Sequence, residues 1–150
     1  MRSDNWCSDR PLDEWYGVAT DAEGHVTELR LPHNNLRGGL AHEIADLQHL
    51  RILDLSHNEL DGELVYELPT GSGAASKSDL NDLTALVEVN LSHNRLKSAT
   101  GSIPKWENMP ALRKVDLSYN QLCCSVSSRL WIPLFENGRV VDFILNGNQM

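Results

Sequence analysis

The hydrophobic residues of this chain recur with one spacing that is repeated five times. Each unit reads Leu-x-x-Leu-x-Leu-x-x-Asn-x-Leu, with only apolar replacements at the leucine positions. Within a unit, the central Leu-x-Leu alternates with the two-residue period of a β-strand, so its leucines face one side and the residue between them faces the other. The pattern therefore predicts five short strands, and the units begin at Val26, Leu50, Leu86, Leu112 and Val140.

The asparagine of each unit lies where the chain is expected to turn away from its strand. Successive asparagines are 24, 36, 26 and 28 residues apart. The spacings of 24, 26 and 28 fit the roughly 20–29 residues of a leucine-rich repeat, and the spacing of 36 indicates an insertion. A carboxamide at such a turn can satisfy backbone groups of its own unit and of a neighbouring one. We therefore expect a structural asparagine ladder at Asn34, Asn58, Asn94, Asn120 and Asn148.

Further motifs resemble the leucine-rich repeat family, in particular its plant-type subclass. Residues after the asparagines resemble that subclass's L-x-G-x-I-P signature, and residues before the first unit resemble its amino-terminal cap. The resemblance implies an α/β fold, a right-handed solenoid or horseshoe with a parallel sheet on the concave face and an irregular, 3-10 convex side. The matching segments are Gly38, Gly62, Gly101-Ser-Ile103-Pro104, Asn5-Trp6, Trp15-Tyr16-Gly17-Val18, Asp21 and Gly24-His25-Val26.

The resemblance also divides the chain into a cap at residues 1–25 and five repeats at residues 26–150. A Gly/Ser-rich insertion at about residues 65–79 is interpreted either as a tolerated surface loop or as a binding element. No polar closing unit follows the fifth motif, so its apolar face is expected to be partly uncovered. Either the chain is a piece of a longer protein, which we favour, or this end pairs with another molecule.

The cap departs from its relatives in one respect that bears on location. The resemblance implies a bridge between two cap cysteines, but Asp13 and Thr20 occupy those positions. Caps of this kind are similar to those of algal and protist repeat proteins. A cap without a disulfide suits a reducing compartment, and no apolar leader begins the chain. A cytoplasmic location is therefore expected, with an extracellular location as the alternative if a signal peptide was removed.

Composition narrows the classes of partner. The chain has 13 basic and 21 acidic residues, giving a formal charge of 13 − 21 = −8. This balance argues against nucleic acid, because binding to phosphates depends on Lys and Arg. No apolar run approaches the roughly 20 residues of a transmembrane helix. We therefore expect neither a nucleic-acid partner nor membrane insertion.

The outward positions of the predicted strands form the candidate binding surface. They are mainly acidic, so the preferred partner is a protein or peptide with a basic patch; the alternative is a solvated face without a ligand. One column consists of the residue between the two leucines of each Leu-x-Leu, and the other consists of the residue two positions earlier in the chain. The two columns consist of Arg30, Asp54, Asn90, Asp116 and Ile144, and of Glu28, Ile52, Glu88, Lys114 and Asp142.

Enzyme and metal chemistry find less support. The aromatic column His33, His57, His93 and Tyr119 could bind a metal or sense pH, but Ser-His-Asn and Ser-Tyr-Asn are common fillings of this position in the plant-type subclass. No nucleophile, metalloprotease or phosphate-loop motif occurs. We therefore expect no enzyme, cofactor or metal site.

The resemblance implies a protein–protein recognition module, for example the sensing domain of a larger signalling or immune-type receptor. One alternative is a structural scaffold or a repeat element that self-associates through its uncapped carboxy-terminal end. A remote alternative is a hydrolase or metal enzyme on the concave face.

Overall fold

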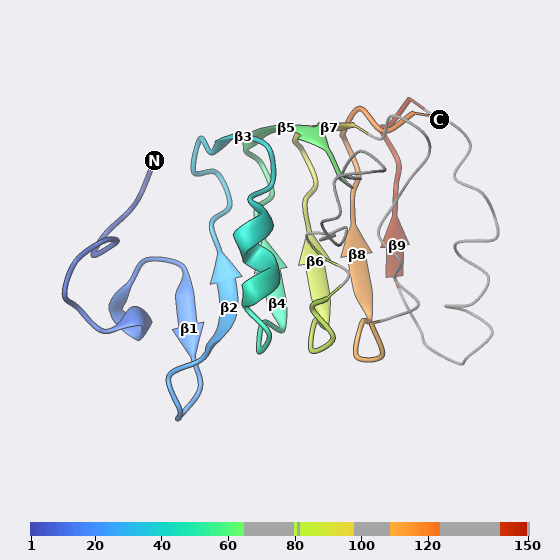
Figure 1. Cartoon of the computed structure of the whole chain (residues 1–150). Helices are drawn as coiled ribbons and strands as arrows, with labels where there is room; N and C mark the ends of the chain where they lie inside the picture. Colours follow the sequence, from blue (N-terminus) through green and yellow to red (C-terminus); the bar gives the residue numbers. More distant parts are fainter. Residues whose placement is uncertain (65–79, 81, 98–108, 124–141, 150) are drawn as a thin grey trace, which may run out of the picture.

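The computed structural model describes residues 1–64, 80, 82–97, 109–123 and 142–149. These residues form short strands and two 3-10 helices that follow one another along a single axis, with the first and last strands at opposite ends (Figure 1). The elements are η1 (Leu12–Glu14), β1 (Val18–Thr20), β2 (Val26–Arg30), β3 (Arg37–Gly38), η2 (His42–Asp46), β4 (Ile52–Asp54), β5 (Glu59–Glu63), β6 (Glu88–Asn90), β7 (Arg95–Lys97), β8 (Lys114–Asp116) and β9 (Asp142–Ile144).

One strand from each unit enters the main sheet. Its order is β1-β2-β4-β6-β8-β9, and the strands stand side by side in chain order (Figure 1). The cap strand β1 is antiparallel to β2, whereas every later neighbour is parallel. Parallel neighbours with the same register mean that each unit repeats the path of the one before it. The chain is thus a stack of similar coils.

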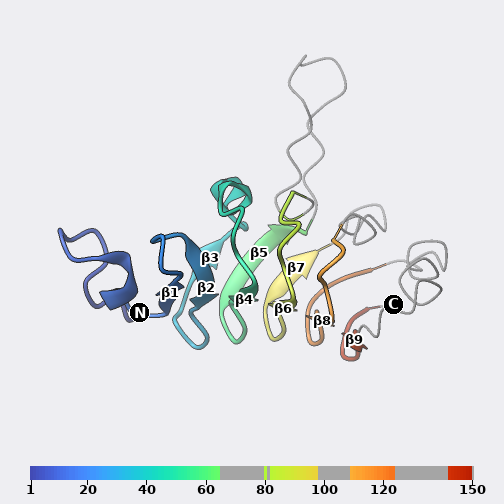
Figure 2. The ribbon, with the colours of Figure 1, turned by 90° about the horizontal axis from the view of Figure 1, so that it is seen from below.

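The side of the coils away from the main sheet has less regular structure. A second, three-stranded sheet of order β3-β5-β7 runs along one edge, and η2 lies on the side opposite the main-sheet strands (Figure 2). Together with the main sheet, this arrangement confirms the predicted leucine-rich repeat solenoid with a parallel sheet and a 3-10 outer side.

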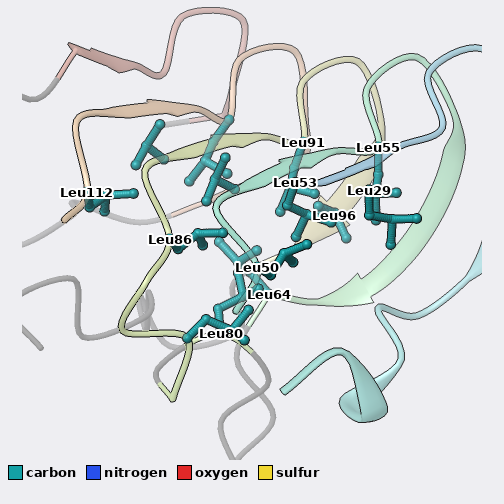
Figure 3. Packing of buried hydrophobic residues seen from close by; sticks show 14 of the residues in the cluster. Leu29, Leu50, Leu53, Leu55, Leu64, Leu80, Leu86, Leu91, Leu96 and Leu112 are labelled. Atoms are coloured by element: carbon teal, nitrogen blue, oxygen red, sulfur yellow. The ribbon is translucent and has the colours of Figure 1, made fainter. Parts of the chain in front are cut away.

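The repeated apolar positions build one continuous core between the two sides (Figure 3). The strand centres Leu53, Val89 and Val115 are 0% exposed, and the residues on either side of them in the strand are half-buried. Burying a side chain of this size contributes about 1.5–3 kcal/mol. A three-residue strand cannot be stable alone, so the coils are held by leucines stacked from one unit on the next.

Some sequence predictions lie outside the described residues, namely the insertion at 65–79, the Gly101–Pro104 match and the start of the fifth unit. In the part of the chain that is described, no helix is long and apolar enough to cross a membrane.

Candidate concave binding surface

The two predicted columns of outward residues are aligned by the register of the main sheet. Neighbouring strands pair Arg30 with Asp54, Asp54 with Asn90, and so on to Ile144. The second column aligns in the same way from Glu28 to Asp142. The ten side chains therefore project from adjacent strands in two parallel rows, although their role in binding stays a prediction.

Ion pairs neutralise part of the acidic charge on this surface. Arg30 Nε lies 2.9 Å from Glu28 Oε2, and Lys114 Nζ lies 2.9 Å from Glu88 Oε1. The hydrogen bond from each basic group to its carboxylate raises the pKa of Arg30 and of Lys114 above their usual values. The other acidic residues of the two columns carry the negative charge that these ion pairs do not neutralise. They are Asp54, Asp116 and Asp142.

Two of these carboxylates are oriented by a hydroxyl that recurs in each coil. Asp54 Oδ1 accepts hydrogen bonds from the amide and the hydroxyl of Ser56 at 3.0 and 2.7 Å. Asp116 makes the same pair with Ser118 at 3.0 and 2.6 Å. The buried serines were not among the predicted residues, but the Ser that follows each Asp-Leu was their signal. These bonds hold Asp54 and Asp116 in one orientation on a rigid strand.

The asparagines lie behind this surface and join successive coils. Asn94 Nδ2 donates to the carbonyls of Leu55 in the preceding coil and Leu91 in its own coil, at 3.0 and 3.1 Å. Asn94 Oδ1 accepts from the amide of Leu60 at 2.9 Å. Each carboxamide thus satisfies backbone groups of two coils at once. Carboxamides that bond across coils in this way belong to Asn58, Asn94, Asn120 and Asn148.

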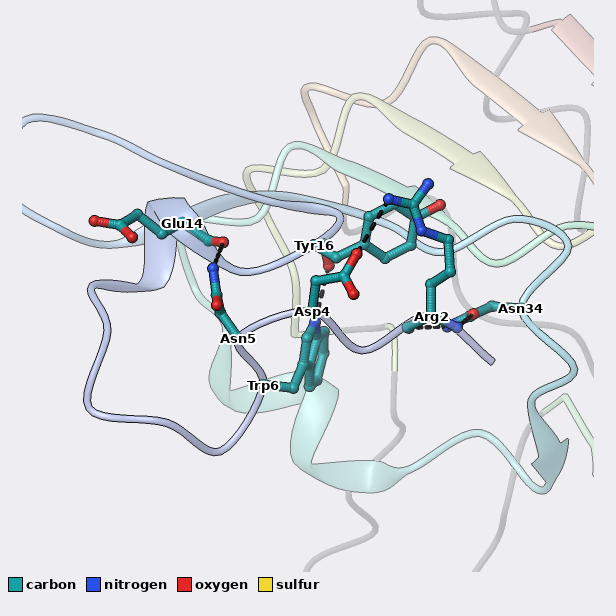
Figure 4. A network of polar contacts seen from close by, with 7 residues as sticks. All are labelled: Arg2, Asp4, Asn5, Trp6, Glu14, Tyr16 and Asn34. Atoms are coloured by element: carbon teal, nitrogen blue, oxygen red, sulfur yellow. Dashed lines mark hydrogen bonds and ion pairs between the residues drawn. The ribbon is translucent and has the colours of Figure 1, made fainter.

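At the cap, the first asparagine bonds to the start of the chain instead of to a preceding repeat (Figure 4). Asn34 Nδ2 donates to the carbonyl of Arg2 at 2.9 Å, and the Arg2 amide donates back to Asn34 Oδ1. The Arg2 guanidinium also lies 4.2 Å from the centre of the Tyr16 ring, and Trp6 Nε1 donates to the Tyr16 carbonyl at 2.9 Å. The cap segment therefore takes the place of a preceding coil.

The aromatic column forms a continuous stack. The ring centres of His33, His57, His93 and Tyr119 are separated by 4.1, 4.1 and 4.3 Å in turn. All four residues have positive φ angles between 52° and 54°. Each ring thus occupies the same tight turn in its coil, and the coil spacing holds the rings face to face.

This stack predicts a dependence of stability on pH. Desolvation, and then repulsion by His93 and His33, lower the pKa of His57 below its usual value, although Asp54 and Asp116 act in the opposite direction. The unfolded chain therefore binds more protons, and stability falls as pH drops from about 6.5 through the lower pKa of the folded state. We expect the melting temperature of the unsubstituted protein to fall relative to that of His57→Asn between about pH 7.5 and pH 5. Asparagine tolerates the positive φ, and a difference that is the same at every pH would contradict the expectation.

The structure also brings together three residues that the sequence did not indicate as a site. His25 stacks on His49 with ring centres 3.9 Å apart, and Asp21 Oδ2 lies 3.1 Å from His25 Nδ1. The signal was present, because His25 and His49 are 24 residues apart, the same separation as Asn34 and Asn58. Residues one repeat apart occupy equivalent positions in adjacent coils.

Comparison with known proteins agrees with this architecture. A family model described as a leucine-rich repeat matches residues 46–63. The chain is 28% identical to Protein STRUBBELIG-RECEPTOR FAMILY 2 of Arabidopsis thaliana over 61% of its length. It is 33% identical to the calmodulin-binding receptor kinase CaMRLK of the same organism over 71% of its length. The chain spans only 14% of each of these two relatives.

A solved structure is similar over nearly the whole chain. The leucine-rich repeat ectodomain of the Arabidopsis receptor kinase HAESA, in complex with an IDA peptide hormone, matches with a TM-score of 0.73 and 26% identity. The match covers 97% of this chain and 22% of the HAESA chain.

These similarities overturn one prediction. The expected cytoplasmic location is wrong, because the similar HAESA structure is the leucine-rich repeat ectodomain of a receptor kinase, and ectodomains lie outside the cell. The missing cap disulfide was a poor guide, since a stack of coils holds its cap through packing and hydrogen bonds as well. The matches and the observed coils together identify the chain as a leucine-rich repeat protein of the type found in plant receptor ectodomains.

Proposed function

We propose that this domain recognises a protein or peptide on the concave face of its main sheet, as the sensing part of a larger receptor. One observation carries the proposal: two rows of outward side chains are aligned on rigid strands, in a fold whose similar HAESA ectodomain is bound to a peptide hormone. Side chains held on strands are suited to recognition, because their positions are set before the ligand arrives.

The charge of the surface supports a basic partner. Its ten positions carry two basic and five acidic residues, a net charge of 2 − 5 = −3. A ligand with Lys or Arg side chains would be attracted to this surface and placed in register by the acidic groups. Half-buried Ile52 and Ile144 add apolar contacts beside them.

The proposed organisation is a cap at residues 1–25 followed by repeats at residues 26–150. The hydrogen bonds between Arg2 and Asn34 support it, since they continue the pattern of the repeats into the cap. We further propose that the domain acts by binding and not by catalysis, in keeping with the similar leucine-rich repeat ectodomains. Signalling by a kinase or another domain of the full-length protein belongs to the same proposal.

The proposal is tested by removing charge from the surface without disturbing the fold. Asn90 makes the same hydrogen bonds to Ser92, at 3.1 and 2.7 Å, that Asp54 and Asp116 make in their coils. Asp54→Asn/Asp116→Asn should therefore preserve the turn and remove two negative charges. Peptides selected from a random twelve-residue library should be enriched in Lys and Arg, and the double variant should bind them about 3- to 10-fold more weakly, as expected for exposed charges.

Asp61→Asn is the matched control. Asp61 is exposed on β5 in the second sheet, so the same type of substitution removes one negative charge away from the concave face. Its peptide affinity should stay within error of the parent, and all the variants should melt at similar temperatures. Selected peptides that respond to Asp61→Asn and not to the double variant would place binding elsewhere on the molecule.

The second candidate function is a self-associating scaffold. It is favoured by β9, the last strand of the described sheet, where Leu145 is half-buried although its equivalent Leu117 is fully buried. Sedimentation velocity at increasing concentration separates the candidates, since a receptor module of this kind stays monomeric while a scaffold grows.

A further inference from the structure

The turn between β1 and β2 and the loop before β4 bring three metal-ligating side chains together. Asp21 and His25 belong to the cap hairpin, and His49 belongs to the next coil. One donor atom of each residue lies within 4.8 Å of the other two, and among the described residues no other group of three or more such side chains meets this condition. Asp21 Oδ2 lies 3.1 Å from His25 Nδ1 and 4.0 Å from His49 Nδ1.

The carboxylate of this cluster is held by its own turn. Asp21 Oδ1 accepts hydrogen bonds from the amides of Glu23 and His25 at 3.1 and 2.8 Å. The Asp21 amide donates to the His25 carbonyl at 3.0 Å, which closes the turn. Because Oδ1 is occupied by the backbone, Oδ2 is left on the side of the two imidazoles.

The two imidazoles are positioned by the stacking of the coils. His25 and His49 each lie one residue before the first apolar position of a repeat, Val26 and Leu50. Next to them, the amide of Arg51 donates to the carbonyl of Thr27 at 2.8 Å, which joins the two coils. The rings are stacked 3.9 Å apart with an interplanar angle of 4°, and both present Nδ1 to the same carboxylate oxygen. The fold therefore sets the backbone positions of the three residues and the orientation of the Asp21 carboxylate.

We propose that Asp21, His25 and His49 bind a Zn²⁺ ion that cross-links the cap to the first repeat. Zn²⁺ takes imidazole nitrogen and carboxylate oxygen at about 2.0–2.1 Å in tetrahedral geometry, which places neighbouring donor atoms about 3.4 Å apart. The observed separations of 3.1 and 4.0 Å bracket that value. Because the stacked rings lie in nearly parallel planes, the imidazoles must turn about their side-chain bonds to direct both Nδ1 lone pairs at one ion. The imidazoles are 48% and 55% exposed, so water completes the coordination.

The sequence predicts no metal site because its most regular histidine pattern is the column His33, His57 and His93, whose residues are typical of the repeat. There, His33, His57 and His93 stack on one another as His25 and His49 do, but within the described part of the chain none of them belongs to a group of three donor residues with atoms this close. The cluster at Asp21 adds a carboxylate oxygen within 4.8 Å of a nitrogen of each imidazole.

The test is titration of the whole chain with ZnCl₂, followed by isothermal calorimetry and thermal unfolding. We expect binding of one ion and a melting temperature that rises with Zn²⁺ concentration, because the ion binds only the folded state. Mg²⁺ should have no effect, since it prefers oxygen ligands and octahedral geometry. Co²⁺ in place of Zn²⁺ should show the visible absorption of a tetrahedral nitrogen–oxygen site.

His49→Asn and His57→Asn form the matched pair of variants. Loss of an outer-shell partner costs about 10–100-fold in metal affinity, so loss of the ligand His49 should cost at least as much. His57→Asn should leave Zn²⁺ affinity unchanged. Zn²⁺ binding that is lost in His57→Asn but kept in His49→Asn, or no saturable binding by the unsubstituted chain, would overturn the proposal.

Discussion

Replacing Asn58 with alanine is expected to lower the free energy of unfolding by on the order of 3 kcal/mol, from the cost of buried groups left without partners. Asn58 Nδ2 donates to the carbonyls of Leu31 and Leu55 at 2.8 and 2.9 Å, in two different coils. Its Oδ1 accepts from the amides of Asn34 and Leu36 at 2.9 and 3.0 Å. Alanine removes all of these bonds at a position that is only 8% exposed, so the backbone groups lose their partners in a buried site.

The control for this substitution is Asn146→Ala. Asn146 is exposed, so the same chemical deletion there should change the free energy of unfolding by less than about 0.5 kcal/mol. Urea denaturation of both variants gives the comparison. Equal losses in the two variants would show that the carboxamide of Asn58 does not hold the coils together.

Replacing Gly17 with alanine is expected to destabilise the cap by about 2–6 kcal/mol, since backbone strain and overpacking each cost about 1–3 kcal/mol. Gly17 has φ +80°, and an added Cβ would lie 2.2 Å from the carbonyl oxygen of Arg30 and 2.8 Å from Leu31 Cδ2. The amide of Arg30 donates to the Gly17 carbonyl at 2.7 Å, so this close approach is also the hydrogen-bonded junction between cap and first repeat. The backbone of Arg30 cannot move without disturbing β2.

Gly24→Ala separates the two causes. Gly24 has φ +86°, yet an added Cβ there would meet nothing within 4 Å. Its cost is therefore the backbone strain alone, about 1–3 kcal/mol. We expect Gly17→Ala to melt at a lower temperature than Gly24→Ala, and hydrogen exchange in residues 2–30 to increase mainly in the former. Equal melting temperatures would mean that the collision with Arg30 is relieved at no cost.

Much of the fold could be predicted because the same pattern of buried and exposed positions recurs in each repeat. The alternation at Leu53 and Leu55 predicts a strand with one buried face, and Val89 and Val115 recur at the equivalent buried position. The same periodicity aligned the outward columns, which the register of the sheet pairs residue for residue. Location could not be derived in this way, because the absence of a cap disulfide is compatible with either compartment.

The sequence by itself determined the repeating part of this protein: where each strand lies, which side chains are buried and which asparagines join the coils. It could do so because those contacts connect equivalent positions of adjacent units. Only the tertiary structure decided what the cap contributes, namely the seating of Gly17 against Arg30, the bonds of Arg2 to Asn34, and the approach of Asp21 to His49. The repeat period places His49 beside His25, but the contacts of Gly17, Arg2 and Asp21 join unlike segments and follow no period, so they depend on the path of the chain in space.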